Sequence, residues 1–344
     1  MKIDKKNITL KDVALRAGVS VATASRSLGN YGYVDKETKK KVLKAAKDLN
    51  YHFNSIAKGL RTKRTHTIGF LLPDITNPFY TRIAKGIQDY AYEKGYSVVI
   101  AYDDSMSNKT IKFFEMFFQD RMEGLIFSTP YNEVLEEMCR NTLKKGIPVV
   151  SCYGTKKVRF SDLIQSDAIG GCYKATKFLF DSGFPNFFVI KVKDSSISQR
   201  RFEGIEKFYE EIGKKLNKDF VLEVKDYSDR CGYEAAKEVF ILGKKPTAIF
   251  CFGEQLAIGV MRAAKDCNIS IPDELSLVSV DDVIASQLTP SITSVSLPVY
   301  HAGQVAANLI IERIEGKKRI KSREIYLEER FIIRESTSYN RLGN

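Results

Sequence analysis

Six side chains of this 344-residue chain have the chemistry to hold a polyhydroxyl molecule. Two are carboxylates, one is a guanidinium and three are aromatic: Asp74, Phe79, Tyr153, Arg201, Tyr227 and Asp281. Asp281 and Arg201 can hydrogen-bond hydroxyl groups, and Phe79 and Tyr227 can stack on the ligand. An alternative stays open for Arg201 and Asp281, which can instead form a structural ion pair across a cleft.

The strands and helices expected around these six residues indicate where in the fold the six side chains come together. Apolar runs typical of strands alternate with helix-length segments from residue 67 onward, in two sets. Such alternation predicts parallel sheets covered on both faces, and two sets predict two lobes. Each of the six side chains falls at or just after a strand, and ligands of open α/β sheets bind beyond the carboxyl ends of the strands. The runs are 67–72, 98–101, 124–127, 148–152, 187–192, 220–224, 248–252 and 275–280, with helices near 78–94, 107–121 and 132–145.

The sequence contains no motif typical of a catalytic site or a metal site. The six cysteines lie apart without a C-x-x-C pair, which favours small buried thiols, and the three histidines are far from one another. No glycine-rich phosphate loop, dinucleotide fingerprint or G-x-S-x-G motif occurs. We therefore expect no catalytic residue, no metal site and no cofactor, and we expect that the protein is not an enzyme.

The positive charge of the chain is concentrated at its start. Residues 1–64 hold 16 Lys and Arg against five Asp and Glu, a balance of +11 out of +12 for the whole chain. Such asymmetry indicates a polyanionic partner, because each cation set against a phosphate releases condensed counterions. No run of eighteen apolar residues and no secretory signal is present, so we expect a cytoplasmic protein.

Three short helices are predicted in this basic segment. Thr9 precedes a T-x-x-D capping box, Ser20 can cap a second helix over 21–28, and Asp35 can cap a third. Two helices joined by a three-residue turn and supported by a third form a helix-turn-helix, here over residues 9–29. Its second helix fits the major groove, where Arg26 can grip guanine and Thr23 or Ser25 can hold a phosphate.

The same residues carry a family resemblance. The run from Ile8 to Ala14, continued by 17–23 and by Ser25 and Arg26, resembles the LacI/GalR family of bacterial repressors, with Val21 and Ala22 at its specificity positions. Residues 50–61 resemble the family's hinge, which becomes helical over the minor groove, where Leu60 would wedge between base steps. The resemblance and the helix pattern together give the expected DNA-binding residues: Thr9, Ser20, Val21, Ala22, Thr23, Ser25, Arg26, Asn30, Tyr51, Asn54, Ala57, Lys58 and Leu60.

The rest of the chain is similar to the periplasmic-binding-protein-like core of that family. The matching segments are 74–80, 201–204, 280–282 and 291–295, and Arg201 and Asp281 match the family's ligand contacts best. Tyr153, the Gly253-Glu254 pair and Leu297 depart from the usual residues and make the expected pocket less polar. The resemblance implies three crossings between lobes, which suit closure on a ligand.

The expected architecture is an all-α helix-turn-helix DNA-binding head followed by an α/β core of two doubly wound parallel-sheet lobes. The head covers 1–64 and includes a hinge helix near 54–62; the core covers 65–344. Lobe 1 is expected near 65–165 and 295–325, and lobe 2 near 166–293 and 326–340.

These patterns predict a transcriptional regulator, most simply a repressor, that binds palindromic double-stranded operator DNA as a homodimer. Its effector would be a small molecule, a carbohydrate or a derivative of one, held between the lobes. A second hypothesis keeps the DNA-binding head but makes the effector a phosphorylated carrier protein, as in catabolite control.

Overall fold

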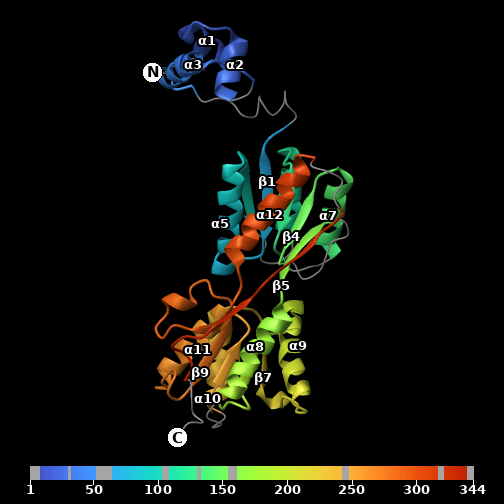
Figure 1. Cartoon of the computed structure of the whole chain (residues 1–344), viewed down its shortest axis with the longest axis vertical. Coiled ribbons are helices and arrows are strands. Elements are labelled where there is room, and N and C mark those ends of the chain that lie inside the picture. The colour runs from blue at the N-terminus through green and yellow to red at the C-terminus, as the bar shows by residue number, and fades with distance from the viewer. Residues whose placement is uncertain are drawn as a thin grey trace. The chain divides into compact units, whose positions relative to one another are not determined.

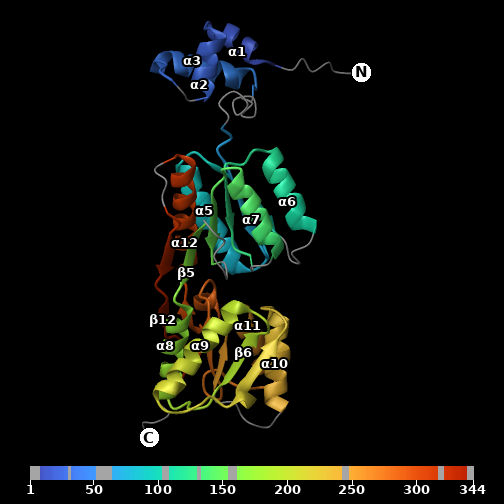
Figure 2. The same cartoon turned by 90° about the vertical axis from the view of Figure 1, so that its right-hand side faces the viewer.

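The computed structural model describes residues 8–29, 32–51, 64–102, 108–129, 133–153, 161–241, 248–316 and 321–338. Its contacts divide the chain into two units, Met1–His66 and Thr67–Asn344, which we describe separately. The first is the head and the second is the core (Figures 1 and 2).

Within the described ranges 8–29 and 32–51, the head has three helices around a small apolar centre. Its helices are α1 (Leu10–Ala17), α2 (Val21–Gly29) and α3 (Lys36–Asp48). Three residues separate α1 from α2, and Gly18 begins that turn with a left-handed φ of 66°. Val13, Ala24 and Val42, one from each helix, are fully buried against one another. The predicted helix-turn-helix arrangement is confirmed.

The core contains two α/β lobes, and six strands pair into a sheet in each lobe within the described ranges. In the first lobe the strand order is β11-β5-β4-β3-β1-β2, and every strand pair is parallel. The elements are β1 (Thr67–Leu72), α5 (Pro78–Glu93), β2 (Ser97–Tyr102), α6 (Asn108–Gln119), β3 (Gly124–Phe127), α7 (Glu133–Lys144), β4 (Val149–Cys152), β5 (Asp162–Ser166), α12 (Val299–Ile314) and β11 (Glu324–Leu327).

Side chains of β1 show how this sheet is covered on both faces. Phe70 belongs to a core that includes residues of α5 and α12, whereas its neighbour Leu71 packs with phenylalanines of α6. Successive side chains of a strand point to opposite faces. Figure 2 shows α6 and α7 on the side of the sheet away from α12. Phe113, Phe114 and Phe117 of α6 are therefore core residues, while Met116 remains 37% exposed.

The second lobe has the strand order β12-β10-β9-β8-β6-β7. The pairs are parallel except for β12, which runs antiparallel to β10 at the edge of the sheet and differs from the all-parallel expectation. The elements are α8 (Ala168–Asp181), β6 (Phe188–Val192), α9 (Ser196–Glu211), η1 (Lys218–Phe220), β7 (Val221–Val224), α10 (Asp229–Ile241), β8 (Ala248–Cys251), α11 (Glu254–Asp266), β9 (Ser276–Val280), η2 (Ala285–Gln287), β10 (Thr293–Ser296) and β12 (Arg330–Ile332).

The chain passes between the lobes three times: after β5, after β10 and between β11 and β12. The three expected lobe boundaries shift by one to three residues. Ser166, expected in the second lobe, ends β5 of the first sheet. All of β10 belongs to the second sheet, because it pairs with β9 and β12, and β11 pairs with β5 of the first sheet as far as Leu327.

No helix among the described residues is long and apolar enough to cross a membrane. The six cysteines are free: Cys139, Cys152, Cys172 and Cys251 are buried, as expected for small apolar groups, and Cys231 and Cys267 are half-buried.

Candidate functional site

The outward face of α2 is the first candidate site. Ala24 is buried beneath it, while Val21 is 43% exposed and Ala22 and Arg26 are also exposed. The hydroxyl of Ser20 accepts a hydrogen bond from the Thr23 amide at 3.1 Å, which fixes the start of the helix. A helix with small side chains and one arginine on its free face matches the dimensions and hydrogen-bonding pattern of the DNA major groove.

Arg26, in the last turn of α2, lies close to the segment that follows the helix. Its aliphatic stem lies beside Gly32, so that a Cβ at Gly32 would come within 3.2 Å of the arginine Cδ. Gly32 also has a φ of 67°, a conformation that L side chains rarely adopt. The guanidinium is left at the surface of the head.

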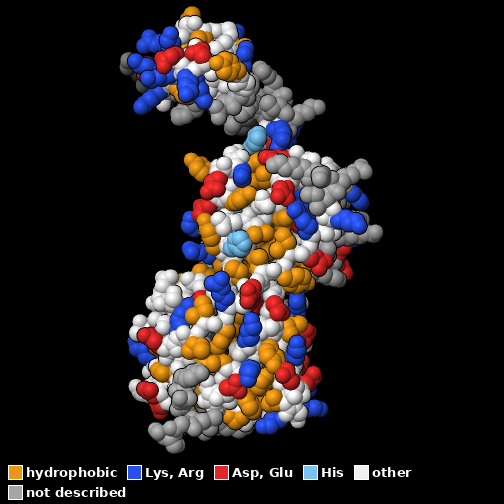
Figure 3. Space-filling view, in the orientation of Figure 1, with side chains coloured by type: hydrophobic (Ala, Val, Ile, Leu, Met, Phe, Trp, Pro, Cys, Tyr) orange, Lys and Arg blue, Asp and Glu red, His pale blue; other side chains and the backbone are white. Residues whose placement is uncertain are grey.

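Another helix of the head, α3, also exposes positive charge. Lys40, Lys44 and Lys47 of α3 are exposed, and Figure 3 shows Lys and Arg side chains gathered on the head. These side chains can neutralise phosphates without reading sequence.

Three of the remaining residues expected to bind DNA, Thr9, Ser25 and Tyr51, do not lie on the exposed face of α2. The amide and hydroxyl of Thr9 both donate to the carboxylate of Asp12 at 2.7 Å, which completes the predicted cap of α1. Ser25 is half-buried, and Tyr51 packs half-buried against the head core. Five further residues lie outside the described ranges: Asn30, Asn54, Ala57, Lys58 and Leu60.

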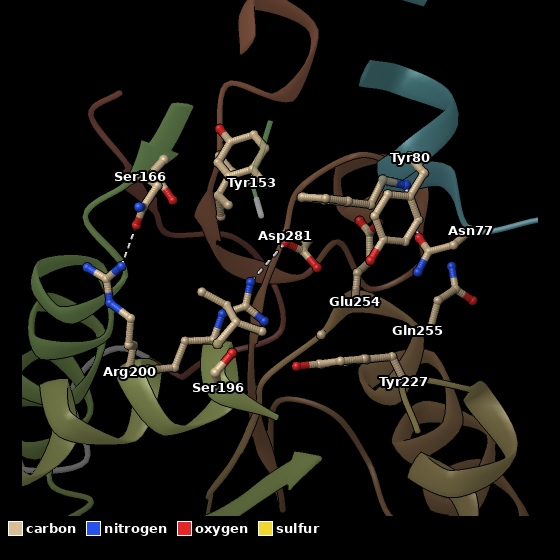
Figure 4. Close-up of a pocket in the computed structure, with 16 residues that line it drawn as sticks. Asn77, Tyr80, Tyr153, Ser166, Ser196, Arg200, Tyr227, Glu254, Gln255 and Asp281 are labelled. Atoms are coloured by element: carbon tan, nitrogen blue, oxygen red, sulfur yellow. Dashed lines mark hydrogen bonds and ion pairs between the residues drawn. The ribbon is translucent and has the colours of Figure 1, made fainter. Parts of the chain in front are cut away.

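The second candidate site is a pocket between the two lobes of the core (Figure 4). The space inside it, including the mouth of the cleft, is about 880 Å³. The first lobe supplies Asn77, Phe79, Tyr80, Tyr153, Gln165 and Ser166, and the second supplies Ser196, Ile197, Arg200, Arg201, Tyr227, Gly253, Glu254, Gln255 and Asp281, with Leu297 in a crossover.

Arg201 and Asp281 lie together on the second-lobe side. Arg201 is only 5% exposed; one guanidinium nitrogen donates to the Phe252 carbonyl, and another lies 3.4 Å from the Asp281 carboxylate. Burial raises the pKa of Asp281, and the guanidinium of Arg201 opposes that effect without cancelling it. Asp281 directly follows β9 with a φ of 75°, which turns the chain into the pocket.

Aromatic rings form the opposite walls. Phe79 contacts Tyr80 and Tyr153, with ring centroids 5.0 and 5.5 Å apart. Tyr227 is held by hydrogen bonds between its hydroxyl and those of Ser195 and Ser198, at 3.0 and 2.9 Å. The buried hydroxyl of Tyr153 has no hydrogen-bond partner among the described residues. The rings present flat apolar faces with polar edges, a surface suited to a sugar-like ring.

Glu254, the first residue of α11, adds a second acid. It is 4% exposed, and its carboxylate accepts a hydrogen bond from the Ile284 amide at 2.8 Å. Burial, together with the nearby Asp281 and Asp282 carboxylates, raises the pKa of Glu254 to about 7.

Asp74 does not line this pocket. It is exposed, and its carboxylate accepts hydrogen bonds from the amide and hydroxyl of Thr76 at 2.8 and 2.6 Å. It shapes the turn before α5, so its expected place among the ligand contacts is corrected. Among the described residues, no group of three or more His, Cys, Asp or Glu side chains is arranged to hold a metal ion.

Two family models match these two units. Residues 9–54 match bacterial regulatory proteins of the lacI family, and residues 176–337 match a periplasmic-binding-protein-like domain. The transcriptional regulator RegA of Clostridium saccharobutylicum is 33% identical over 96% of this chain and 99% of its own length.

The chain belongs to the lacI family.

Other lacI-family relatives agree along nearly the whole chain. Catabolite control protein A of Priestia megaterium is 30% identical over 96% of this chain and 99% of its own. The transcriptional repressor PurR of Photobacterium profundum is 29% identical over 95% of this chain and 98% of its own. The protein is thus a DNA-binding transcriptional regulator, as the sequence predicted.

Solved structures show the same fold. A lacI-family regulator from Enterococcus faecium with bound ribose has a TM-score of 0.71 at 26% identity, covering 80% of this chain and 100% of that one. The lac repressor dimer bound to operator and an anti-inducer has a TM-score of 0.82 at 24% identity, covering 96% and 99%. The predicted head and two-lobed core are confirmed as a lacI-type fold.

In this lacI-family chain the pocket brings together five of the six residues expected at the ligand, all except Asp74. Sequence reasoning missed several others. Asn77 and Tyr80 lie within the segment 74–80, which resembles the family's core. Glu254 departs from the residue usual in the family at that position. Gln165, Ser196 and Arg200 carried no signal, because only the approach of the two lobes brings them to one cavity.

Proposed function

We propose that this regulator is a repressor that binds a palindromic operator as a homodimer and whose operator affinity is set by a small polyhydroxyl effector in the inter-lobe pocket. Arg26, with Val21 and Ala22, reads base edges, while Ser20, Thr23, Ser25 and nearby basic residues hold phosphates. Tyr51 and the segment 54–62 complete the DNA-binding region.

One observation carries the link between ligand and DNA: the pocket is lined by both lobes. A molecule touching Phe79 and Tyr153 on one side and Arg201 and Asp281 on the other favours one arrangement of the lobes over others. Such differential contact is what allows a ligand to shift a conformational equilibrium.

Exposed apolar side chains on the first lobe favour dimerisation. β2 is an edge strand on which Ile100 and Tyr102 are 40% and 47% exposed, and Ile111 of the adjoining α6 is 43% exposed. Exposed apolar side chains of this kind suit contact with a second copy, and a two-fold dimer matches a palindromic site.

We further infer that the protein works in the cytoplasm, where its DNA is, and that it is not an enzyme. All the relatives described above are named as regulators or control proteins. The pocket chemistry serves recognition.

The similarity to a catabolite control protein supports a second candidate, in which a phosphorylated carrier protein is the effector. Calorimetry separates the two: heat of binding with a sugar supports the first, whereas silence to sugars and tight binding of the carrier protein supports the second.

The proposal is tested by selecting genomic fragments that the full chain retains, with and without a panel of sugars, and repeating the titration with Asp281→Asn. Asparagine tolerates the positive φ at this position. We expect the variant to bind the selected duplex normally and to lose the effector response. A variant that still responds fully would contradict the proposed site; thermal unfolding of the variant checks that it is folded.

A further inference from the structure

Two consecutive arginines of α9 reach the pocket, and their electrostatic surroundings differ. Arg201 is buried and is matched by the carboxylate of Asp281. Arg200 is half-buried and lines the same cavity, where its guanidinium donates to the side-chain oxygen of Gln165 (Figure 4). A neutral amide positions a guanidinium without neutralising it.

Within the described parts of the chain, Arg200 has no carboxylate partner in ion-pair distance. Two other arginines of the second lobe do have carboxylate partners: Arg230 pairs with Glu234 at 2.8 Å, and Arg262 pairs with Asp229. A cavity that holds one unmatched guanidinium favours a ligand with a negative charge, because the partly buried site weakens solvent screening.

Other groups at this end of the pocket are hydrogen-bond donors. Ser196 and Ile197, the first two residues of α9, also line the cavity, and the first amides of a helix have no partner within it. The same helix end carries partial positive charge. The buried hydroxyl of Tyr153, which has no partner among the described residues, lines the pocket as well.

Acidic groups do not cancel this charge. Asp281 is engaged with Arg201, and Glu254 stands with Gln255 and Asn77 on the other side of the cavity (Figure 4). Because burial raises its pKa to about 7, Glu254 carries only part of a charge near neutral pH.

We propose that the effector is a polyol carrying one anionic group, a carboxylate or a phosphate, and that Arg200 binds that group while the Arg201 and Asp281 side of the pocket holds hydroxyls. This inference rests on the proposed function, because it assumes that the inter-lobe pocket is the effector site. It narrows the effector from carbohydrates in general to acidic ones.

The test is calorimetric titration of the full chain with a panel of neutral sugars, the matched uronic acids and the matched sugar phosphates. The best acidic probe should bind at least tenfold more tightly than its neutral parent. The uronic-acid and phosphate arms identify which anion the site takes.

Arg200→Gln should remove that preference, lowering the affinity for the acidic probe at least tenfold while leaving the neutral parent unchanged, and Arg200→Lys should retain part of it. Arg230→Gln on α10 is the matched control, and it should behave as the unaltered protein does.

Neutral sugars that bind as tightly as their acidic counterparts, with no effect of Arg200→Gln, would overturn the inference and leave the proposed function standing. Failure of every sugar in the panel, neutral and acidic, to bind would instead contradict both.

Discussion

Single residues on α2 determine how the head can read DNA. Val21 and Ala22 offer only apolar contact, so Arg26 is the residue of this face that can form paired hydrogen bonds with a base. Its aliphatic stem lies beside Gly32, and its guanidinium is exposed.

Arg26→Ala should therefore cost about 1–3 kcal/mol at the cognate site and relax the base preference there. Competition binding against duplexes altered at one base pair measures both effects. An equal loss on every sequence would show that Arg26 contacts phosphate only.

Glu254 predicts a pH dependence of stability. Its pKa of about 7 lies above the ordinary 4.5, so the folded chain binds this proton more tightly than the unfolded chain does. The resulting stabilisation is complete below about pH 4.5 and is lost as the pH rises through 7.

Between pH 5 and pH 8 the protein should lose about 2–3 kcal/mol relative to Glu254→Gln, which keeps the acceptor for the Ile284 amide. Urea unfolding of both proteins across this range measures the difference. If the free energy of unfolding had the same pH dependence in both proteins, Glu254 would be ionised over the whole range from pH 5 to pH 8.

For single residues, the sequence predicted the helix caps and the buried positions well, because these depend on residues that are close in sequence. The hydroxyl of Ser20 and the carboxylate of Asp35 accept from amides three residues later, as expected. Arg200 and Gln165 were not predicted, since they meet only after two distant segments fold.

The helices that cover the sheets share one packing device, close contact through glycine. A Cβ at Gly86 of α5 would lie 2.1 Å from a backbone oxygen of α12, and a Cβ at Gly303 of α12 would lie 2.2 Å from one of α5. α10 and α11 pack equally closely. A Cβ at Gly232 of α10 would lie 2.1 Å from a backbone oxygen of α11, and a Cβ at Gly259 of α11 would lie 2.0 Å from one of α10. Each pair is therefore locked at one separation.

Gly86→Ala should destabilise the core by about 1–3 kcal/mol, because the added methyl group forces the two helices apart. In a helix free of this contact the same change would stabilise by up to about 1 kcal/mol. Chemical unfolding measures the sign, with Tyr92→Ala, at a 78% exposed position of α5, as the control. A stabilised Gly86→Ala would refute the close-contact account.

Elements with strong periodicity were predicted to within a few residues, as α5 and β1 illustrate. β5, β10, β11 and β12 were not predicted as strands. β11 and β12 are short and only partly buried, with polar residues between apolar ones, and their strand form comes from pairing with sequence-distant partners. Tertiary context of this kind leaves little local pattern.

At the scale of the whole molecule, three crossovers join two lobes that share one pocket, and the first lobe is joined in sequence to the head. Asp162, the fully buried first residue of β5, receives hydrogen bonds from Arg313 at 2.6 Å and from the Arg323 amide at 2.7 Å. This cluster ties β5 to α12 and to the start of β11. These contacts all lie within the first lobe and hold its elements together.

If effector binding in the pocket and operator binding by the head are energetically coupled, linkage makes the coupling measurable in two directions. If the effector changes operator affinity by some factor, the operator must change effector affinity by the same factor. Fluorescence anisotropy of the selected duplex with and without effector gives the first number, and calorimetry of the effector with free and operator-bound protein gives the second. We expect the two factors to be equal and to lie at about 5–150. An effector that binds in the pocket but leaves operator affinity unchanged would rule out this coupling.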